Sequence, residues 1–205
     1  MNIVGALTTW KEEDLVAIIG PRNATERECL LAYELGKKTA SKGKIVVSGL
    51  AEGIDTYAHQ GALDAGGKTI AVLGISTDET IFPEANKQLS ERIKENGALI
   101  FPFDMSSTDF DKHNSILMKR RIRTRGRRLI ERNVLMAHIS KVIIAITDQY
   151  IEGGTRWALN YGEKFGKEVF QMNSKAKFIV PRFAEDELDW NPEIKLSDID
   201  ILLKG

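Results

Sequence analysis

Six short runs of apolar, mostly β-branched residues recur along the chain and predict β-strands. Their apolar positions are continuous rather than alternating, which is typical of strands that are covered on both faces of a sheet. The runs are Leu15–Ile19, Ile45–Val47, Thr69–Leu73, Ala98–Phe101, Val142–Ile146 and Val169–Gln171.

Longer amphipathic stretches lie between these runs and predict helices. The first, Glu26–Ser41, follows Thr25 and Glu28 in capping-box spacing and ends before Gly43. The others are Asp55–Ala65, Glu84–Glu95, Ile130–His138 and Thr155–Phe165. Strands that alternate with crossover helices predict an α/β fold: a doubly wound, mainly parallel, Rossmann-like sheet with helices on both faces.

The domain organisation follows from the same pattern. The 205 residues are 42% hydrophobic and 28% charged, which is ordinary for a globular chain and excludes disorder, collagen and coiled coil. The alternation fills residues 1–175, which we predict to be one Rossmann-like domain. Residues 176–205 are richer in acids, and we expect them to form a short tail that packs on this domain.

Glycine-containing loops follow four of the predicted strands. In a doubly wound sheet, ligands bind at the carboxyl ends of the strands, and glycine lets backbone N–H groups approach an anion at a helix N-terminus. None of the four matches GxGxxG or GxxxxGK[ST], so the loops predict a phosphate site without a standard dinucleotide or triphosphate motif. The loops are Gly20-Pro21-Arg22, Ser48 to Asp55, Gly74 to Thr77 and Gly153-Gly154-Thr155.

The formal net charge is zero, with 29 basic and 29 acidic residues, but the charges are unevenly distributed. Nine basic residues and one acid lie between Lys112 and Arg132, so this segment carries a net charge of plus eight and the remainder minus eight. Such a segment attracts polyanions. We expect it to contact the phosphates of a nucleic acid, although a solvated basic helix or loop is the plainer alternative.

Cysteine content and hydropathy bear on the compartment. Cys29 is the sole cysteine, which excludes an internal disulfide. The N-terminus lacks the pattern of a signal peptide, and the apolar run Val142–Ile146 is far too short to cross a membrane. We therefore expect a cytoplasmic protein without a membrane anchor, a metal or another cofactor.

Several motifs together resemble the DNA processing protein A (DprA/Smf) family. The segments are VAIIGPRNAT, VVSGLAEGIDTYAHQGAL, TIAVLGIS with IFPEAN, ERNVLMAHIS and GGTRWALNYGEKFGKEVF, and they extend over about Val16 to Gln171. The resemblance implies a Rossmann-like domain that forms homodimers and binds single-stranded DNA. It also implies a role in DNA processing and recombination, including natural transformation, with loading of a RecA-type recombinase.

The loops, the basic segment and the resemblance together define the expected site. By resemblance, Arg22 stands at the arginine after the first strand, and Gly153 begins the triplet where the family usually has Ser-Gly-Ser. We expect phosphate or nucleic-acid contacts from Arg22, Ser48, Gly49, Gly53, Gly74, Arg120, Arg121, Arg123, Arg125, Arg132, Asn133, Gly153, Gly154 and Thr155.

Three further residues belong to the motifs, but their roles are open at this point. Asp55 and His59 share a helix face, which fits an acid/base pair, yet helix capping and a hydrogen bond to a neighbouring loop are the stronger readings. Phe82 precedes Pro83 and fits either base stacking or a buried loop anchor.

Two other functions compete with single-strand binding. One is a nucleoside-monophosphate phosphoribohydrolase of the related lysine-decarboxylase-like group, whose PGGxGTxxE motif carries a glutamate one turn into the helix. After Thr155 this chain has Arg156, Trp157 and Ala158, so we expect no catalytic residues and no enzymatic turnover. The other is a sensor of a small nucleotide, which would need one or two basic groups and not nine.

Overall fold

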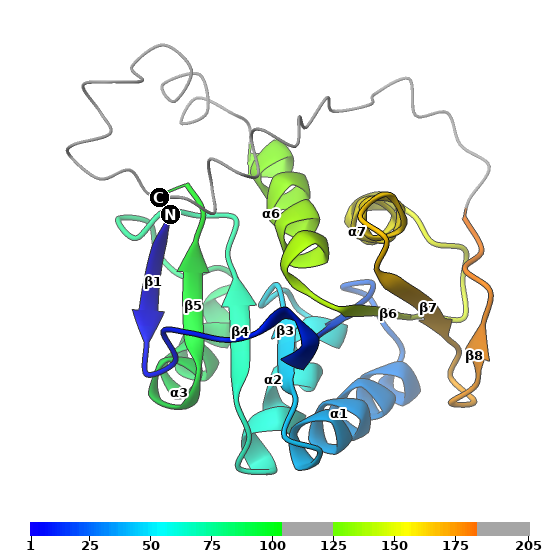
Figure 1. Cartoon of the computed structure of the whole chain (residues 1–205), viewed down its shortest axis with the longest axis horizontal. Coiled ribbons are helices and arrows are strands. Elements are labelled where there is room, and N and C mark those ends of the chain that lie inside the picture. Colours follow the sequence, from blue (N-terminus) through cyan, green and yellow to red (C-terminus); the bar gives the residue numbers. More distant parts are fainter. Residues whose placement is uncertain (104–124, 184–205) are drawn as a thin grey trace.

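An eight-stranded, mostly parallel sheet forms the centre of the molecule (Figure 1). The computed structural model describes residues 1–103 and 125–183. The strand order is β1-β5-β4-β3-β2-β6-β7-β8, with β1 and β8 antiparallel to their neighbours. The strands are β1 (Asn2–Gly5), β2 (Leu15–Ile19), β3 (Ile45–Ser48), β4 (Thr69–Val72), β5 (Ala98–Phe101), β6 (Val142–Ile146), β7 (Glu168–Met172) and β8 (Phe178–Ile179).

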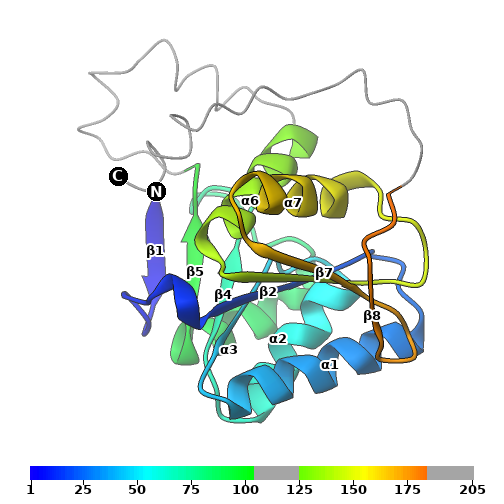
Figure 2. The ribbon, with the colours of Figure 1, turned by 45° about the vertical axis from the view of Figure 1, so that its right-hand side comes forward.

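The helices cover the sheet on both faces. Figure 2 shows α1, α2 and α3 on one face and α6 and α7 on the other. The described helices are α1 (Glu26–Ser41), α2 (Ile54–Asp64), α3 (Lys87–Asn96), α6 (Arg125–Ile139) and α7 (Gly153–Lys164), with short 3-10 turns at Glu12–Asp14 and Glu84–Asn86. This is a doubly wound α/β fold, as the sequence pattern predicts.

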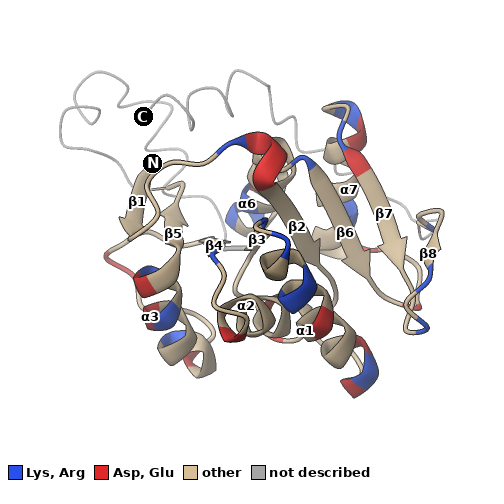
Figure 3. Ribbon diagram, turned by 60° about the horizontal axis from the view of Figure 1, so that its bottom comes forward, with Lys and Arg blue, Asp and Glu red and all other residues tan. Residues whose placement is uncertain are grey.

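The apolar runs form strands because both of their faces are buried. In β2, Ala17 and Ile19 pack with α6 and α7, whereas Ile18 between them packs with α1 and α2. A run that alternated polar and apolar residues would bury a polar side chain on one of these faces. Figure 3 accordingly shows the charged residues mainly on helices and loops, with the strands almost free of them.

The two helices that follow β2 and β3 begin and pack in ways that the sequence explains. Thr25 and Glu28 form the expected capping box at the start of α1. Helices α1 and α2 then approach closely at two glycines: a Cβ on Gly36 would lie 2.3 Å from the Ala58 carbonyl oxygen, and one on Gly61 would lie 2.0 Å from the carbonyl oxygen of Tyr33. Larger residues there would push the helices apart.

The structure differs from the sequence-based expectations in its edge elements. All six predicted strands are present and parallel, but the sheet also has β1 and β8 at its edges. Because β8 pairs with β7, the expected domain boundary at residue 175 lies inside a hairpin. Residues 184–205, the greater part of the expected tail, lie outside the described residues.

Two helices begin three or more residues away from the predicted start. Helix α6 begins at Arg125, five residues before the predicted start, so part of the basic segment is helical. The predicted helix from Glu84 begins as a 3-10 turn and becomes α-helical only at Lys87. Within the described part of the chain, no helix is long and apolar enough to cross a membrane.

Candidate nucleic-acid interface

A cavity of about 470 Å³ lies at the carboxyl ends of β2 and β6. The chain runs from β2 through β3 and β4 to β5 on one side, and β6 lies on the other side of β2, so the strand order reverses between these two strands. Such a switch point separates two neighbouring loops and opens a crevice, which is where open α/β sheets bind ligands. The volume falls within the range of small-ligand cavities.

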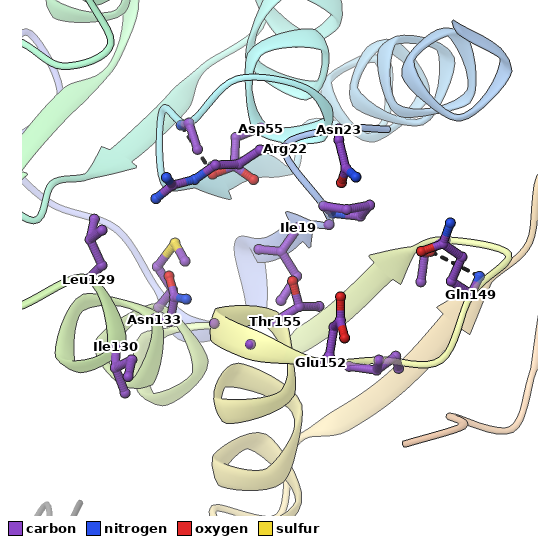
Figure 4. A pocket seen from close by; sticks show the side chains of 18 of the residues that line it. Ile19, Arg22, Asn23, Asp55, Leu129, Ile130, Asn133, Gln149, Glu152 and Thr155 are labelled. Atoms are coloured by element: carbon purple, nitrogen blue, oxygen red, sulfur yellow. Dashed lines mark hydrogen bonds between the residues drawn. The ribbon is translucent and has the colours of Figure 1, made fainter. Parts of the chain in front are cut away.

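Figure 4 shows how the walls of the cavity are built. Arg22 and Asp55 lie on one side, and Asn133 and Thr155 lie on the opposite side. They come from the loop after β2, the start of α2, helix α6 and the start of α7. The structure therefore brings together predicted site residues that are far apart in the sequence.

The N-terminus of α7 forms one wall. Glu152 is its N-cap residue and makes no side-chain cap hydrogen bond, and Gly153, Gly154 and Thr155 form the first turn. The first N–H groups of a helix have no acceptor within that helix, and the helix dipole adds positive potential there. Gly153 has a φ of +54°, in the left-handed region where glycine is favoured. This wall is suited to binding an anion.

Arg22 faces the cavity from the loop after β2 and is exposed. The backbone of this loop is in close contact with Gly53, whose φ is +75°: a Cβ on Gly53 would lie 2.6 Å from the Pro21 carbonyl oxygen and 2.7 Å from that of Arg22. Gly53 borders neither this cavity nor the smaller one described below. Its role in this structure is to let two loops approach each other, which positions Arg22.

Arg132 lies at the base of the cavity and is only 4% exposed. Its Nη1 donates a hydrogen bond to the Val72 carbonyl oxygen at 3.1 Å and lies 3.8 Å from Asp55 Oδ2. Its Nε has no hydrogen-bond partner among the described residues. The sequence predicts a phosphate ligand here, whereas the structure shows a buried guanidinium that contributes positive potential to the cavity and whose Nε is itself buried.

Asp55 is held by backbone N–H groups at the start of α2. Its Oδ2 accepts hydrogen bonds from the Gly49 N–H at 3.1 Å and the Ala51 N–H at 3.2 Å. Burial raises the pKa of this carboxyl group, and the charge of Arg132 and the two N–H groups act in the opposite direction. The carboxylate thus fixes the Ser48–Asp55 loop and does not cap α2, whose N-cap residue is Gly53 and has no side-chain cap hydrogen bond.

Ser48 and His59 lie in the core and do not line the cavity. Ser48 Oγ donates to the Ile18 carbonyl oxygen at 2.6 Å, and both side chains are fully buried. His59 Nδ1 lies 2.7 Å from Thr69 Oγ1, whose own proton goes to the Val46 carbonyl oxygen. His59 Nδ1 therefore carries a proton and donates it to Thr69, as in the neutral Nδ1–H tautomer.

The environment of His59 agrees with this neutral state. Burial, with a smaller effect from the charge of Arg132, lowers the pKa of His59 to about 3. The ring bonds to β4, whereas Asp55 bonds to the loop before its own helix. The structure therefore does not support an acid/base pair between these two residues.

A smaller cavity of about 50 Å³ adjoins the first, and Arg22, Ala51, Leu129 and Arg132 line both. Its further lining includes Gly49, Gly74 and Phe82. Phe82 is 49% exposed, which favours the stacking alternative over a buried loop anchor. Leu129 packs over Gly74, since a Cβ on Gly74 would lie 2.7 Å from Leu129 Cδ2.

The basic segment reaches the cavity through α6. Arg120, Arg121 and Arg123 lie outside the described residues, and Arg125 is the first residue of α6. Two later arginines are paired, Arg127 with Glu131 and Arg128 with Glu79. One turn further on, Asn133 lines the cavity; a Cβ on Gly154 would lie 2.5 Å from its Nδ2. Helix α6 therefore connects the basic segment to the anion-binding wall.

Five polar or aromatic residues of the cavity are missing from the sequence-based site: Asn23, Thr147, Gln149, Tyr150 and Glu152. They lie in the loops after β2 and β6, on either side of the switch point. The predicted site contains mainly the turns in which glycine is present. Considering every polar or aromatic residue of those two loops would have found these five as well.

The loop after β6 is also tied to the first helix. The Asp148 N–H donates to Glu28 Oε1 at 2.9 Å, across 120 positions of sequence. Glu28 is the buried carboxylate of the α1 capping box, so one side chain supports both the start of α1 and the loop that carries the cavity residues.

The fold and the site define a doubly wound α/β protein with a crevice at its switch point that is suited to an anion. The chain belongs to the DNA recombination-mediator protein A family, whose model matches residues 2–182. This confirms the resemblance to the DprA/Smf family that the sequence motifs indicate.

Individual relatives agree with the family. The chain is 29% identical to protein Smf of Synechocystis over 157 residues, which cover 77% of this chain and 35% of that protein. It is 44% identical to the DNA processing protein DprA of Streptococcus pneumoniae over 78 residues, covering 38% of this chain and 27% of that protein. These matches thus span about a third of the curated relatives or less.

A solved structure shares the fold. The DNA processing protein A of Helicobacter pylori, described for its single-stranded DNA binding mode, superposes with a TM-score of 0.62 at 24% identity. The match covers 98% of this chain and 86% of that one. The similarity extends over nearly the whole chain at the level of the fold.

Proposed function

We propose that this protein binds single-stranded DNA along the carboxyl edge of its sheet, in DNA processing and recombination. The observation that carries the proposal is the cavity at the switch point, where Arg22 and the N-terminus of α7 face each other. A phosphate between them would accept hydrogen bonds from backbone N–H groups and a guanidinium. The relative from Helicobacter pylori, known for its single-stranded DNA binding mode, supports the same conclusion.

The charge around the cavity favours an anion. Arg132 is buried at its base, and the nearby carboxylate of Asp55 already accepts two backbone N–H groups. The basic segment Lys112–Arg132 leads into the same wall through α6. Arg127, Arg128 and Arg132 are engaged by protein groups. The other six basic residues of the segment still exceed what a mononucleotide needs, which favours a long polyanion over a small nucleotide.

Phe82 adds an aromatic surface to this edge. It is half-exposed in the smaller cavity, next to Arg22 and Arg132. Single-strand binders combine a positive groove with aromatic rings on which bases stack, and every base has a face that can stack. We therefore expect little sequence preference.

The geometry favours binding without turnover. His59 is neutral and bonded to Thr69, and Asp55 is engaged by the loop before its helix. Among the described residues, no three His, Cys, Asp or Glu side chains are grouped to hold a metal ion. Release of free base from a nucleoside monophosphate, lost in Thr155→Val, would contradict this part of the proposal.

Family membership also bears on partners and location. We propose that the chain acts as a homodimer, that a RecA-type recombinase is its protein partner, and that it works in the cytoplasm. Light scattering would give the oligomeric state. Co-sedimentation of recombinase with DNA, in the presence and absence of this protein, would test the second partner.

A length series tests the function. Fluorescence anisotropy should show affinity that rises from a mononucleotide to an oligonucleotide beyond about 16 nucleotides, the upper size of a single-strand site per domain. Arg22→Gln should weaken binding, whereas the matched variant Arg27→Gln should not. Arg27 is exposed on α1, where it bonds to the Ser174 carbonyl oxygen. Equal affinity for a mononucleotide and a long strand would contradict the proposal and favour a small nucleotide.

A further inference from the structure

Tyr150 is an exposed aromatic residue that the phosphate site does not explain. It lies in the loop after β6, borders the larger cavity and is 62% exposed. A large aromatic ring gains stability from burial, so an exposed ring beside a polar cavity is available for a planar ligand.

One face of this ring is supported by a cation. The guanidinium of Arg182 lies over it, 5.5 Å from the ring centroid. Arg182 is itself fixed, because its Nη2 donates to the Asp148 carbonyl oxygen at 2.6 Å and its backbone N–H donates to Gln171 Oε1 at 2.9 Å. Because Arg182 covers one face of the Tyr150 ring, the opposite face is the one on which a base can stack.

A buried glutamine holds the loop that presents the ring. Gln171 is fully buried on β7, and its Nε2 donates to the carbonyl oxygens of Thr147 at 2.9 Å and Gln149 at 3.0 Å. The same side chain accepts the Arg182 N–H, so one amide group joins the loop after β6 to the segment after β8. A loop that is already ordered loses little conformational entropy when it binds.

The position of Tyr150 relative to Phe82 fits a strand that crosses the sheet edge. Phe82 follows β4 and borders the smaller cavity, Tyr150 follows β6 and borders the larger one, and Arg22 borders both. Strands β4 and β6 are separated by β3 and β2, which places their ends about 14 Å apart at the usual strand spacing. The two rings therefore stand on opposite sides of the phosphate site.

We propose that Tyr150 is a stacking platform for a nucleobase of the bound strand, on the side of the phosphate site away from Phe82. This role rests on the proposed binding of single-stranded DNA and adds the residue that holds a base beside the α7 N-terminus. The ligand class is any unpaired base, because the ring offers a flat face, and a backing cation does not distinguish between bases.

Two substitutions separate stacking from apolar contact. Tyr150→Leu removes the ring and keeps an apolar side chain, whereas Tyr150→Phe keeps the ring. Oligonucleotide affinity should fall about fivefold to a hundredfold in Tyr150→Leu and stay near the wild-type value in Tyr150→Phe. Tyr57→Leu is the matched control, because Tyr57 is 40% exposed on α2 and borders neither cavity.

Strands that lack bases supply the second measurement. On a strand of abasic nucleotides, wild type and Tyr150→Leu should bind equally, because only base stacking distinguishes them. A strand that carries 5-iodouracil should also cross-link to Tyr150 on irradiation, as mapped by mass spectrometry. Equal affinity of both proteins for the normal strand would overturn the stacking role alone. Failure of the wild-type chain to bind any strand would overturn this role together with the proposed function.

Discussion

Arg132 occupies the space that a side chain on Gly49 would need. A Cβ on Gly49 would lie 1.2 Å from Arg132 Nη1 and 2.1 Å from its Cζ. Glycine at this position thus leaves the space that the buried guanidinium of Arg132 occupies. The SGL motif, which the sequence analysis assigns to phosphate binding, has a structural function at its glycine.

The first prediction concerns this pair. Gly49→Ala should displace Arg132, break its hydrogen bond to the Val72 carbonyl oxygen and lower the free energy of unfolding by about 2 to 3 kcal/mol. In an Arg132→Ala background the same substitution should cost much less, because the space is then empty. Denaturant titration of the four proteins measures both effects. If Gly49→Ala lowered the free energy of unfolding equally in both backgrounds, contact with Arg132 would not be the reason for glycine at position 49.

The second prediction concerns the wall formed by α7. Gly154→Val should lower oligonucleotide affinity by about tenfold to a hundredfold, because the side chain blocks the approach of a phosphate to the backbone N–H groups and displaces Asn133. Gly126→Ala is the control: Gly126 borders the same cavity, but a Cβ there meets nothing within 4 Å. Normal binding by a folded Gly154→Val protein would place the anion site elsewhere.

The third prediction concerns the acid at the cavity rim. Glu152 stands beside the expected phosphate, so Glu152→Gln should strengthen oligonucleotide binding by up to about fivefold at low salt. Glu163→Gln makes the same charge change in the last turn of α7 and should have little effect. The gain should shrink as salt is added, since screening weakens the repulsion. Weaker binding by Glu152→Gln would instead show that the carboxylate contacts the ligand.

The fourth prediction concerns pH. The pKa of His59 is lowered to about 3 in the folded protein, so between that value and its ordinary value near 6.5 the unfolded state binds more protons. Stability should therefore decrease as pH falls below 6.5, by up to about 1.4 kcal/mol per pH unit from this side chain. His59→Gln should show a shallower slope in denaturant titrations at pH 7, 6 and 5. Parallel slopes would mean that the ring is not held neutral.

The fifth prediction concerns the basic segment. Replacing Arg120, Arg121, Arg123 and Arg125 by glutamine should weaken binding to all strands alike and flatten the dependence of log affinity on log salt by about 0.7 for each lost phosphate contact. The triple variant of Lys37, Lys38 and Lys42, at the end of α1, should leave the slope unchanged. An unchanged slope in the arginine variant would mean that the segment is not part of the interface.

Much of the fold could be predicted because apolar runs and caps are local signals. Helix α1 has the predicted bounds, since the capping box that starts it and the glycine that follows it each lie directly at an end of the helix. Strand β1 was missed because Asn2–Gly5 is short and pairs with one neighbour only, so its sequence needs no continuous apolar run. The two-residue strand β8 gives no periodic signal at all.

The site was predicted in part because the glycines after its strands are also a local signal. Glycines after strands indicate the correct edge of the sheet, and Arg22, Asn133 and Gly154 do meet there. Burial of Arg132 was missed because arginine is usually exposed, and it depends on Val72, Asp55 and Gly49, which lie far away in the sequence. Tyr150 belongs to no motif, and only its place in the loop after β6 could have indicated it from the sequence.

The hydrogen bond between Asp148 and Glu28 ties the assembly of the cavity to a contact of long sequence separation. Its partners are 120 positions apart, and β6 must pair with β2 before the loop after β6 can reach the start of α1. Contacts of such long sequence separation form slowly, because the intervening chain has to be ordered first. A chain whose synthesis has reached β5 already contains Arg22 and the Ser48–Asp55 loop, yet it lacks the opposite wall. The proposed site for a DNA strand therefore has both of its walls only after β6 and α7 have joined the sheet.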